Sequence, residues 1–328
     1  MSEMTQLQQA MQAAFPQTEL RMEEPLALHT SFKIGGPCEV MAFPRTIQEL
    51  SALLRWAHEQ EVQPAVLGSG TNVLASDAGR RGLVICTRGC LDGLEQVNDT
   101  HIRVLAGVSM ARAALFAANL GLSGLEFAHG IPGSVGGGLY MNAGAYGGEI
   151  RQVAVCTEFL DQEGNCHALV GQAQGFGYRR SAFTGTSRII VAGTFALTKA
   201  NPEEIREHMQ SLMARRKASQ PLELPSAGST FKRPVGGYAA ALIEQAGLKG
   251  TRIGGAAVST KHAGFVVNLG GATEADVLAL IAHIQKRVLE TSGISWSRRW
   301  SASEPRLRCV IDRERSSRSP RGVLWRTG

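Results

Sequence analysis

Cysteine is sparse in this sequence, and its spacing excludes the commonest cysteine-based sites. None of the six cysteines forms a Cys-x-x-Cys pair, the spacing typical of structural zinc sites. No stretch approaches the ~18 consecutive apolar residues that a membrane-spanning helix needs. The start of the chain lacks the basic and apolar regions of a secretory signal. We therefore expect a cytoplasmic protein without membrane insertion and, in that compartment, without disulfides.

The motifs of several common enzyme classes are also missing. No Gly-Lys-Ser/Thr follows a glycine-rich turn, which excludes a Walker A phosphate loop. The glycines do not fit Gly-x-Gly-x-x-Gly, which disfavours a Rossmann dinucleotide site. Neither a Gly-x-Ser-x-Gly elbow nor an obvious catalytic triad is present. No His, Cys and carboxylate cluster has the spacing of metal ligands, so we expect no metal.

A positive charge spread over the body of the protein is another absent feature. Residues 297–328 contain nine arginines and three acidic residues, so they carry the entire formal net charge of +6 and leave residues 1–296 neutral. The body also has no basic patches interleaved with aromatic residues, which nucleic-acid surfaces combine. We expect no nucleic-acid partner; binding through the arginine-rich tail is the non-enzymatic alternative.

Glycine, in contrast, is abundant, with 38 residues. Eight glycines fall within residues 129–149, too many for a helix or strand interior, where each costs about 0.5–1 kcal/mol relative to alanine. They alternate with apolar residues such as Ile131, Val135 and Tyr140, which a solvated linker would not carry. We expect an ordered, half-buried segment whose amides face a phosphate-bearing ligand.

A second glycine-rich turn precedes this segment by about 60 residues. The apolar strand expected at 64–67 leads into Gly68-Ser69-Gly70-Thr71-Asn72, and a strand followed by such a turn gathers backbone amides around a phosphate. Two such loops suggest one extended ligand with a pyrophosphate in its middle. A dinucleotide fits that description.

Periodicity and capping residues outline the domain organisation. Thr46-x-x-Glu49 is a capping box that predicts a helix over 47–61. Near a boundary at 200, Pro202 begins a helix whose last turn carries Arg215, Arg216 and Lys217, charges that suit the helix dipole. Strands are expected over 153–160 and 188–197, and a capping box at Thr273 predicts a final apolar-faced helix. We expect a loose or helical arm over 1–24, a first domain over 25–200, a smaller α+β domain over 201–295 and a tail over 296–328.

Four motifs occur in the sequence in the same order as in the family of UDP-N-acetylenolpyruvoylglucosamine reductases, also called UDP-N-acetylmuramate dehydrogenases or MurB. The sequence resembles the shorter subclass of that family. The resemblance covers about residues 25–295 and is carried by residues 67–74, 130–147, 176–179 and 228–232, together with the start His29-Thr30-Ser31-Phe32.

The resemblance implies an α+β fold, with a two-lobed FAD-binding domain of the vanillyl-alcohol-oxidase (PCMH) type followed by a smaller α+β substrate-binding domain. It also implies that NADPH reduces the flavin and that hydride then passes to UDP-N-acetylglucosamine enolpyruvate. The FAD pyrophosphate would be held by Gly68, Ser69, Gly70, Thr71, Asn72, Gly130, Ile131, Pro132, Gly133, Ser134, Gly136 and Gly137.

The chemistry of this reduction needs a fixed positive group and a proton donor, because hydride addition to the methylene carbon leaves enolate-like charge on the carboxylate side. By resemblance, Arg179 stabilises that charge and Ser229 delivers the proton. The same resemblance places Tyr178, Lys232, Asn142 and Tyr146 in substrate binding.

The tail departs from the family pattern. The family ends with Leu-Glu-Pro-Glu-Val, whose second glutamate is catalytic, whereas residues 296–301 here are Trp-Ser-Arg-Arg-Trp-Ser. Written as TGG AGC CGG AGG TGG AGC and read one base earlier, with C in front, these codons encode Leu-Glu-Pro-Glu-Val-Glu, which places the missing acid at position 299. We therefore hypothesise that the chain is frame-shifted from about residue 296. Glu304-Pro305-Arg306 keeps a Glu-Pro pair but has arginine where the acid belongs.

Another flavoenzyme of the same fold, which oxidises a small alcohol or sugar with oxygen, remains an alternative. It would share the two glycine loops, but it has no reason to carry the Tyr178-Arg179 pair and Ser229 together.

Overall fold

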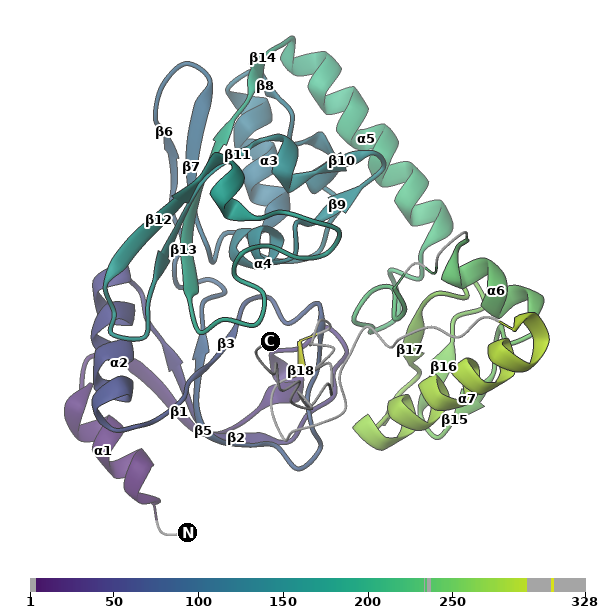
Figure 1. The fold of residues 1–328 in the computed structure, drawn as a ribbon, viewed down its shortest axis with the longest axis horizontal. Coiled ribbons are helices and arrows are strands. Elements are labelled where there is room, and N and C mark those ends of the chain that lie inside the picture. Colours follow the sequence, from purple (N-terminus) through teal and green to yellow (C-terminus); the bar gives the residue numbers. More distant parts are fainter. Residues whose placement is uncertain (1–3, 233, 235–236, 294–307, 310–328) are drawn as a thin grey trace, which may run out of the picture.

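The fold has three parts, each centred on a sheet, in the computed structural model, which describes residues 4–232, 234, 237–293 and 308–309 (Figure 1). Two parts form an N-terminal pair of lobes, and the third lies at the end of a long helix. Among the described helices, none has both the length and the apolar character needed to cross a membrane.

The first lobe is a four-stranded sheet in the order β1-β2-β5-β3, covered by two helices. Strands β2, β5 and β3 are parallel, and β1 joins them antiparallel at the edge. The bounds are α1 Gln6–Ala14, β1 Glu19–Pro25, β2 Pro37–Phe43, α2 Ile47–Glu59, β3 Ala65–Leu67 and β5 Arg80–Cys86. Helix α2 begins as expected, because the Thr46 side chain accepts a hydrogen bond from the Glu49 amide at 3.0 Å.

The second lobe is a five-stranded antiparallel sheet in the order β12-β11-β13-β7-β6. The bounds are β6 Leu94–Gln96, β7 His101–Leu105, α3 Met110–Asn119, α4 Val135–Tyr140, β11 Ala154–Leu160, β12 Cys166–Val170 and β13 Ile189–Ala196. One buried cluster contains Leu53 of α2, Val104 of β7 and Phe195 of β13. The two lobes therefore share a single hydrophobic core.

The third part is a three-stranded sheet, β15-β16-β17, packed against two helices. The bounds are α5 Pro202–Ser219, α6 Ala239–Gln245, β15 Arg252–Ile253, β16 Ala256–Val258, β17 Val266–Asn268 and α7 Glu274–Ser292. Helix α5 packs on the second lobe and descends to this part (Figure 1). Helix α7 has the expected capping box between Thr273 and Asp276 and buries the apolar face predicted from its sequence.

Short 3-10 helices and short strands complete the described fold. The 3-10 helices are η1 Leu26–Leu28, η2 Glu126–Ala128, η3 Ile150–Gln152 and η4 Gly171–Gln174. The short strands are β4 Val73–Leu74, β8 Leu122–Ser123, β9 Gly144–Ala145, β10 Gly148–Glu149, β14 Thr198–Lys199 and β18 Arg308–Cys309. Strand β18 pairs antiparallel with β4, directly after the first glycine turn.

The segment that follows β1 joins the first lobe to the third part. The side chains of Phe32 and Ile34 are buried in the hydrophobic cluster of the third part, together with Val277 and Leu280 of α7. The Asn268 side chain donates a hydrogen bond to the Phe32 carbonyl at 3.0 Å. Two side chains from near the N-terminus, Phe32 and Ile34, therefore complete the C-terminal core.

Most expected elements are confirmed, but one prediction is wrong. The helix in the N-terminal arm is present as α1, whereas residues 19–24 form most of β1 instead of a loose or helical segment. Charged residues such as Glu19 and Arg21 alternate with Leu20 and Met22, and none of these side chains is fully buried. This is the composition of a protected edge strand, which has a weak apolar pattern.

Candidate functional site

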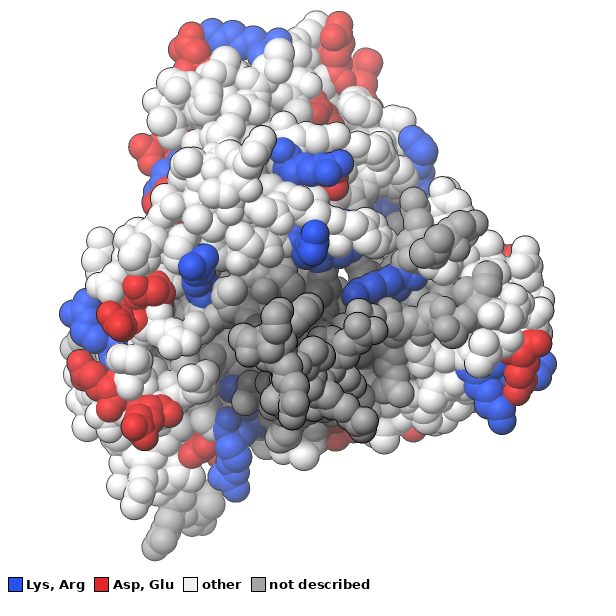
Figure 2. Space-filling model, viewed as in Figure 1, with Lys and Arg blue, Asp and Glu red and all other residues white. Residues whose placement is uncertain are grey.

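A cavity of about 1390 Å³ lies where the three parts of the fold meet. It is lined by both glycine loops and by residues 227–229 of the third part. In Figure 2, lysine and arginine side chains lie around the middle of the face, while acidic side chains lie mostly toward the outer edges. This volume exceeds the roughly 300–1,000 Å³ of ordinary small-ligand pockets, so an extended ligand and a second molecule can share it.

The first loop, residues 68–72, leaves β3 and turns sharply at Gly70. Gly70 has φ +61°, and a Cβ there would lie 2.0 Å from the His29 carbonyl oxygen. A Cβ on Gly68 would lie 2.5 Å from Oγ of Ser134, so the two glycine loops touch. Both positions need glycine because another backbone or side chain approaches them closely.

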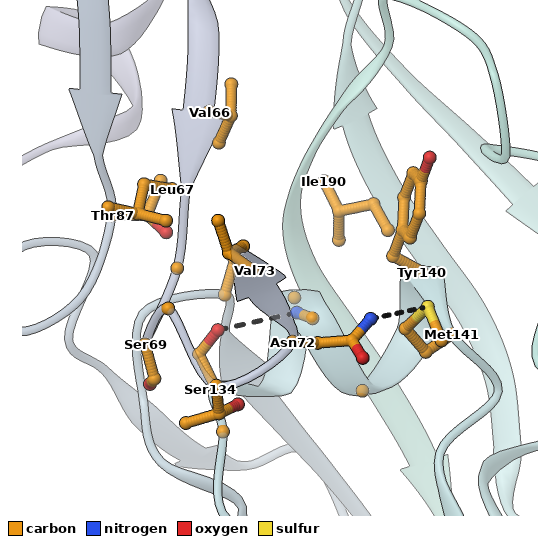
Figure 3. Close-up of a pocket in the computed structure, with 18 of the residues that line it drawn as sticks. Val66, Leu67, Ser69, Asn72, Val73, Thr87, Ser134, Tyr140, Met141 and Ile190 are labelled. Carbon is orange, nitrogen blue, oxygen red and sulfur yellow. Dashed lines mark hydrogen bonds between the residues drawn. The ribbon is translucent and has the colours of Figure 1, made fainter. Parts of the chain in front are cut away.

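The backbone amides of this loop make no hydrogen bond to another described residue. Across the described part of the chain, none of the five amides of residues 68–72 donates a hydrogen bond to the protein. Backbone amides that face no protein acceptor pair with solvent or with a ligand, and successive free amides in a turn form an anion-binding concavity. Figure 3 shows Ser69 and Asn72 on this loop, opposite Ser134 of the second loop.

The second loop is held more tightly by its own lobe. The Val135 amide donates to the Val108 carbonyl at 2.8 Å, and the Gly136 amide donates to the Ala106 carbonyl at 2.9 Å. A Cβ on Gly136 would meet Ala106 Cβ at 2.9 Å. The glycine at this position thus permits close packing on the strand. Within the described residues, the Gly133 and Ser134 amides have no protein acceptor.

Arg179 enters the cavity from the loop after Phe176. Its backbone has φ +56°, an uncommon conformation for a side-chain-bearing residue. Its guanidinium donates to the Gly144 carbonyl at 2.9 Å and to the Asn142 carbonyl at 3.4 Å. The cation is therefore fixed by neutral carbonyl groups, and none of the described carboxylates forms an ion pair with it.

Asn142 lies beneath Arg179 rather than in the cavity. Its side chain is 1% exposed, and its amide donates to the Glu149 carboxylate and to the Gly177 carbonyl, both at 3.0 Å. Its side-chain oxygen accepts from the Arg151 amide at 2.9 Å. These bonds tie the turn that carries Gly144 to the residues just before Arg179. The geometry supports a positioning role for Asn142 in place of the direct substrate contact that the sequence suggested.

Ser229 lines the cavity from a loop that pairs with Phe265. Gly228 before it has φ +75°, which turns the chain toward the cavity. The following Thr230 is 3% exposed and accepts a hydrogen bond from the Val266 amide at 3.1 Å. The backbone next to Ser229 is therefore anchored to the sheet of the third part, while the Ser229 residue itself lines the cavity.

The structure brings together most, but not all, of the residues expected in the site. Tyr146 lines the cavity and stacks under the guanidinium of Arg215 at 4.9 Å. Four expected residues lie outside the cavity lining, namely Asn142, Gly130, Tyr178 and Lys232. Arg216 and Gln220 line the cavity although the sequence interpretation gave Arg216 only a helix-dipole role. No motif marks these two residues, because helix geometry and the bend after α5 place them there.

Ser31 connects the first glycine loop with the loop that carries Ser229. Its amide donates to the Gly70 carbonyl at 3.1 Å, and its hydroxyl donates to the Ser226 carbonyl at 2.6 Å. The bond between Ser31 and Ser226 joins residues 195 positions apart. The position of the Ser229 loop therefore depends on a side chain next to the first glycine loop.

We expect Ser31→Ala to destabilise the protein by about 1 kcal/mol, because it leaves the Ser226 carbonyl without its donor. Urea unfolding at constant m-value measures the change. Ser226→Ala is the matched control, since Ser226 takes part through its backbone carbonyl. Equal destabilisation by both substitutions would contradict the proposed link.

Both halves of the chain match known protein families. Residues 38–169 match an FAD binding domain, and residues 220–298 match the C-terminal domain of UDP-N-acetylenolpyruvoylglucosamine reductase. The protein named UDP-N-acetylenolpyruvoylglucosamine reductase from Levilactobacillus brevis is 46% identical over 282 residues, 86% of this chain and 92% of that protein. Its namesake from Caldanaerobacter subterraneus subsp. tengcongensis is 46% identical over 276 residues, 84% of this chain and 91% of that protein.

A solved structure is similar over the same region. The structure of UDP-N-acetylenolpyruvylglucosamine reductase (MurB) from Thermus caldophilus has 34% sequence identity and a TM-score of 0.71, and the match covers 82% of this chain and 95% of that chain. These similarities confirm the expected fold class, an α+β protein with a two-lobed FAD-binding domain and a smaller α+β domain.

Proposed function

The chain belongs to the family of UDP-N-acetylenolpyruvoylglucosamine reductases, and from this premise we propose how its cavity performs the reaction. The protein is an FAD-dependent oxidoreductase of peptidoglycan synthesis that reduces UDP-N-acetylglucosamine enolpyruvate to UDP-N-acetylmuramate. We propose NADPH as the hydride donor and the cytoplasm as the location. We also propose residues 25–200 as the FAD-binding domain and residues 201–295 as the substrate-binding domain.

The unpartnered amides of residues 68–72 carry the proposed cofactor site. Together with the Gly133 and Ser134 amides, they offer donors that have no acceptor among the described residues to a pyrophosphate, the group that links the two halves of FAD. The close contact between Gly68 and Ser134 brings the two sets of donors to one place. Bound there, FAD supplies hydride-transfer chemistry, and the cavity volume leaves room for a second ligand.

Arg179 and Ser229 are the proposed catalytic side chains. Both line the cavity, and they come from different parts of the fold. Arg179, held by two neutral carbonyl groups, would stabilise the negative charge that develops on the carboxylate side of the substrate. The Ser229 hydroxyl would give its proton to the carbon next to that carboxylate. Tyr146 is proposed to contact the substrate from the cavity wall.

Flavin absorbance tests this function directly. The purified protein should be yellow, lose its absorbance near 450 nm on addition of NADPH under anaerobic conditions, and regain it on addition of UDP-N-acetylglucosamine enolpyruvate. Re-oxidation by this substrate separates the proposal from the alcohol or sugar oxidase alternative, which would be re-oxidised by oxygen alone. A colourless protein that cannot be loaded with FAD would contradict the proposal.

A further inference from the structure

A short hairpin at the edge of the cavity carries one of the groups that fix Arg179. Strands β9 and β10 pair antiparallel, with Gly144 opposite Glu149. The Gly144 carbonyl accepts a hydrogen bond from the Arg179 guanidinium at 2.9 Å, and a Cβ on Gly144 would lie 2.7 Å from Cβ of Glu149. Glu149 is therefore packed against the residue that holds the cation, although it lies outside the cavity lining.

The Glu149 carboxylate also determines how the buried Asn142 side chain is oriented. It accepts a hydrogen bond from the Asn142 amide nitrogen at 3.0 Å, and the same nitrogen donates to the Gly177 carbonyl at 3.0 Å. A turned amide group would place its oxygen against a carboxylate and a carbonyl, two groups that only accept. The pattern therefore permits one orientation of Asn142, since an unpaired buried polar group is costly.

The backbone around this hairpin is strained at three residues with side chains. Asn142, Tyr146 and Arg179 have φ of +42°, +53° and +56°, and such conformations persist only where the surrounding structure holds them. Asn142 connects two of these positions. Its side chain holds Gly177, two residues before Arg179, and its own carbonyl accepts from the Arg179 guanidinium at 3.4 Å. Both the backbone and the charged group of Arg179 therefore depend on Asn142.

The negative charge of Glu149 is balanced by a different arginine. The Glu149 carboxylate forms an ion pair with the exposed side chain of Arg151, and it caps the 3-10 helix η3. No described carboxylate forms an ion pair with Arg179. Glu149 can therefore hold Asn142 with the strength of a charged acceptor and leave the charge of Arg179 available to a ligand.

We propose that Glu149 is a positioning residue, which acts through Asn142 to hold Arg179 in the orientation that meets the carboxylate side of the substrate. This inference rests on the proposed function, because it needs the role proposed there for Arg179. Glu149 itself touches no reacting atom. Its effect should therefore appear only where Arg179 acts, which is the transfer of hydride to the enolpyruvyl group and not the reduction of the flavin by NADPH.

Rapid mixing of the FAD-loaded protein separates these two steps. In Glu149→Ala, re-oxidation by UDP-N-acetylglucosamine enolpyruvate should slow by about 10–10²-fold, the cost of a small misplacement of a catalytic group, while reduction by NADPH keeps the wild-type rate. Asn142→Asp, which changes the donor into an acceptor at nearly the same shape, should show the same selective loss. Glu149→Gln keeps an acceptor and should recover most of the rate. Wild-type re-oxidation in both Glu149→Ala and Asn142→Asp would overturn the proposal.

Glu158→Ala is the matched control for the loss of a hydrogen-bonded glutamate. The Glu158 side chain is 24% exposed, against 23% for Glu149, and it binds Arg103 through two hydrogen bonds of 2.6 and 2.7 Å outside the cavity lining. Its loss should lower the midpoint of urea unfolding and leave re-oxidation at the wild-type rate. An equal slowing of re-oxidation in Glu158→Ala and Glu149→Ala would show a general structural effect and overturn the proposal.

A double-mutant cycle tests whether Glu149 acts through Arg179. In an Arg179→Ala background, Glu149→Ala should slow re-oxidation little further, because the group that it positions is already absent. Fully additive losses would contradict this route.

Ligand binding tests the same point without turnover. UDP-N-acetylmuramate carries a lactyl carboxylate that UDP-N-acetylglucosamine lacks. By calorimetry, Glu149→Ala should weaken binding of the first by about tenfold and leave binding of the second unchanged, whereas equal weakening of both would overturn the proposal. Wild-type protein that is not re-oxidised by UDP-N-acetylglucosamine enolpyruvate would instead contradict the proposed function.

Discussion

Replacement of Ser229 by alanine is expected to lower kcat by about 10²–10⁴, the usual contribution of a positioned proton donor. The cavity lining includes Ser229, and the backbone that holds it is fixed to β17 through Thr230. The substitution should therefore remove the hydroxyl group that donates the proton, without moving the loop. Substrate binding should change much less than kcat, because the lost interaction acts mainly in the transition state.

Rapid-mixing experiments can assign this loss to one half of the reaction. Flavin reduction by NADPH should proceed at the wild-type rate in Ser229→Ala, whereas re-oxidation by UDP-N-acetylglucosamine enolpyruvate should be slow. Ser226→Ala is the control, because Ser226 lies in the same loop outside the cavity lining. A Ser229→Ala variant that re-oxidises as fast as the Ser226→Ala variant would exclude Ser229 as the proton donor.

Restoration of the acidic motif in the tail is expected to raise kcat by about 10²–10³, the usual effect of one charge-stabilising group. The change replaces residues 296–301 by Leu-Glu-Pro-Glu-Val-Glu, or only Arg299 by Glu. These positions lie outside the described residues, so the prediction rests on the sequence of the tail. The family match to the C-terminal domain ends at residue 298, within the same segment.

Two controls separate a restored catalytic acid from a general effect of charge. Arg298→Glu makes the same change in charge one residue earlier and should leave kcat low. Sequencing of the gene across codon 296 tests the frame-shift hypothesis itself, which an uninterrupted single frame would contradict. If kcat stays unchanged when the motif is restored, the tail does not limit this protein.

The sequence predicted the features that depend on local chemistry. The N-cap threonines at 46 and 273 marked helix starts because the backbone amides of a first turn need side-chain acceptors. The full capping box is present at Thr273, whereas the Glu49 carboxylate accepts from the Arg45 amide instead of the Thr46 amide. The first glycine loop is a turn, as predicted, and a Cβ at Gly70 would collide with the His29 carbonyl. Its phosphate-binding role remains a prediction. The catalytic roles of Arg179 and Ser229 rest on the family resemblance and remain predictions.

Features created by tertiary packing were less visible in the sequence. Gly136 was interpreted as a phosphate contact, but its amide and its missing side chain both serve contact with Ala106. Asn142 is buried under Arg179 because a left-handed turn directs its side chain inward, and no sequence pattern records that direction. Arg216 has the same helix-end setting as its exposed neighbour Lys217, and only the fold distinguishes the two.

The burial of Phe32 and Ile34 in the C-terminal core restricts how this protein can be recombined with its relatives. A chimera that exchanges only residues 201–295 would combine new core side chains with the original Phe32 and Ile34, although all of them pack in one hydrophobic cluster. Exchange of the C-terminal part together with residues 29–34 keeps each core with its own partners. In a library of chimeras, the block to exchange therefore consists of two segments that are separated in the gene but packed together in the structure.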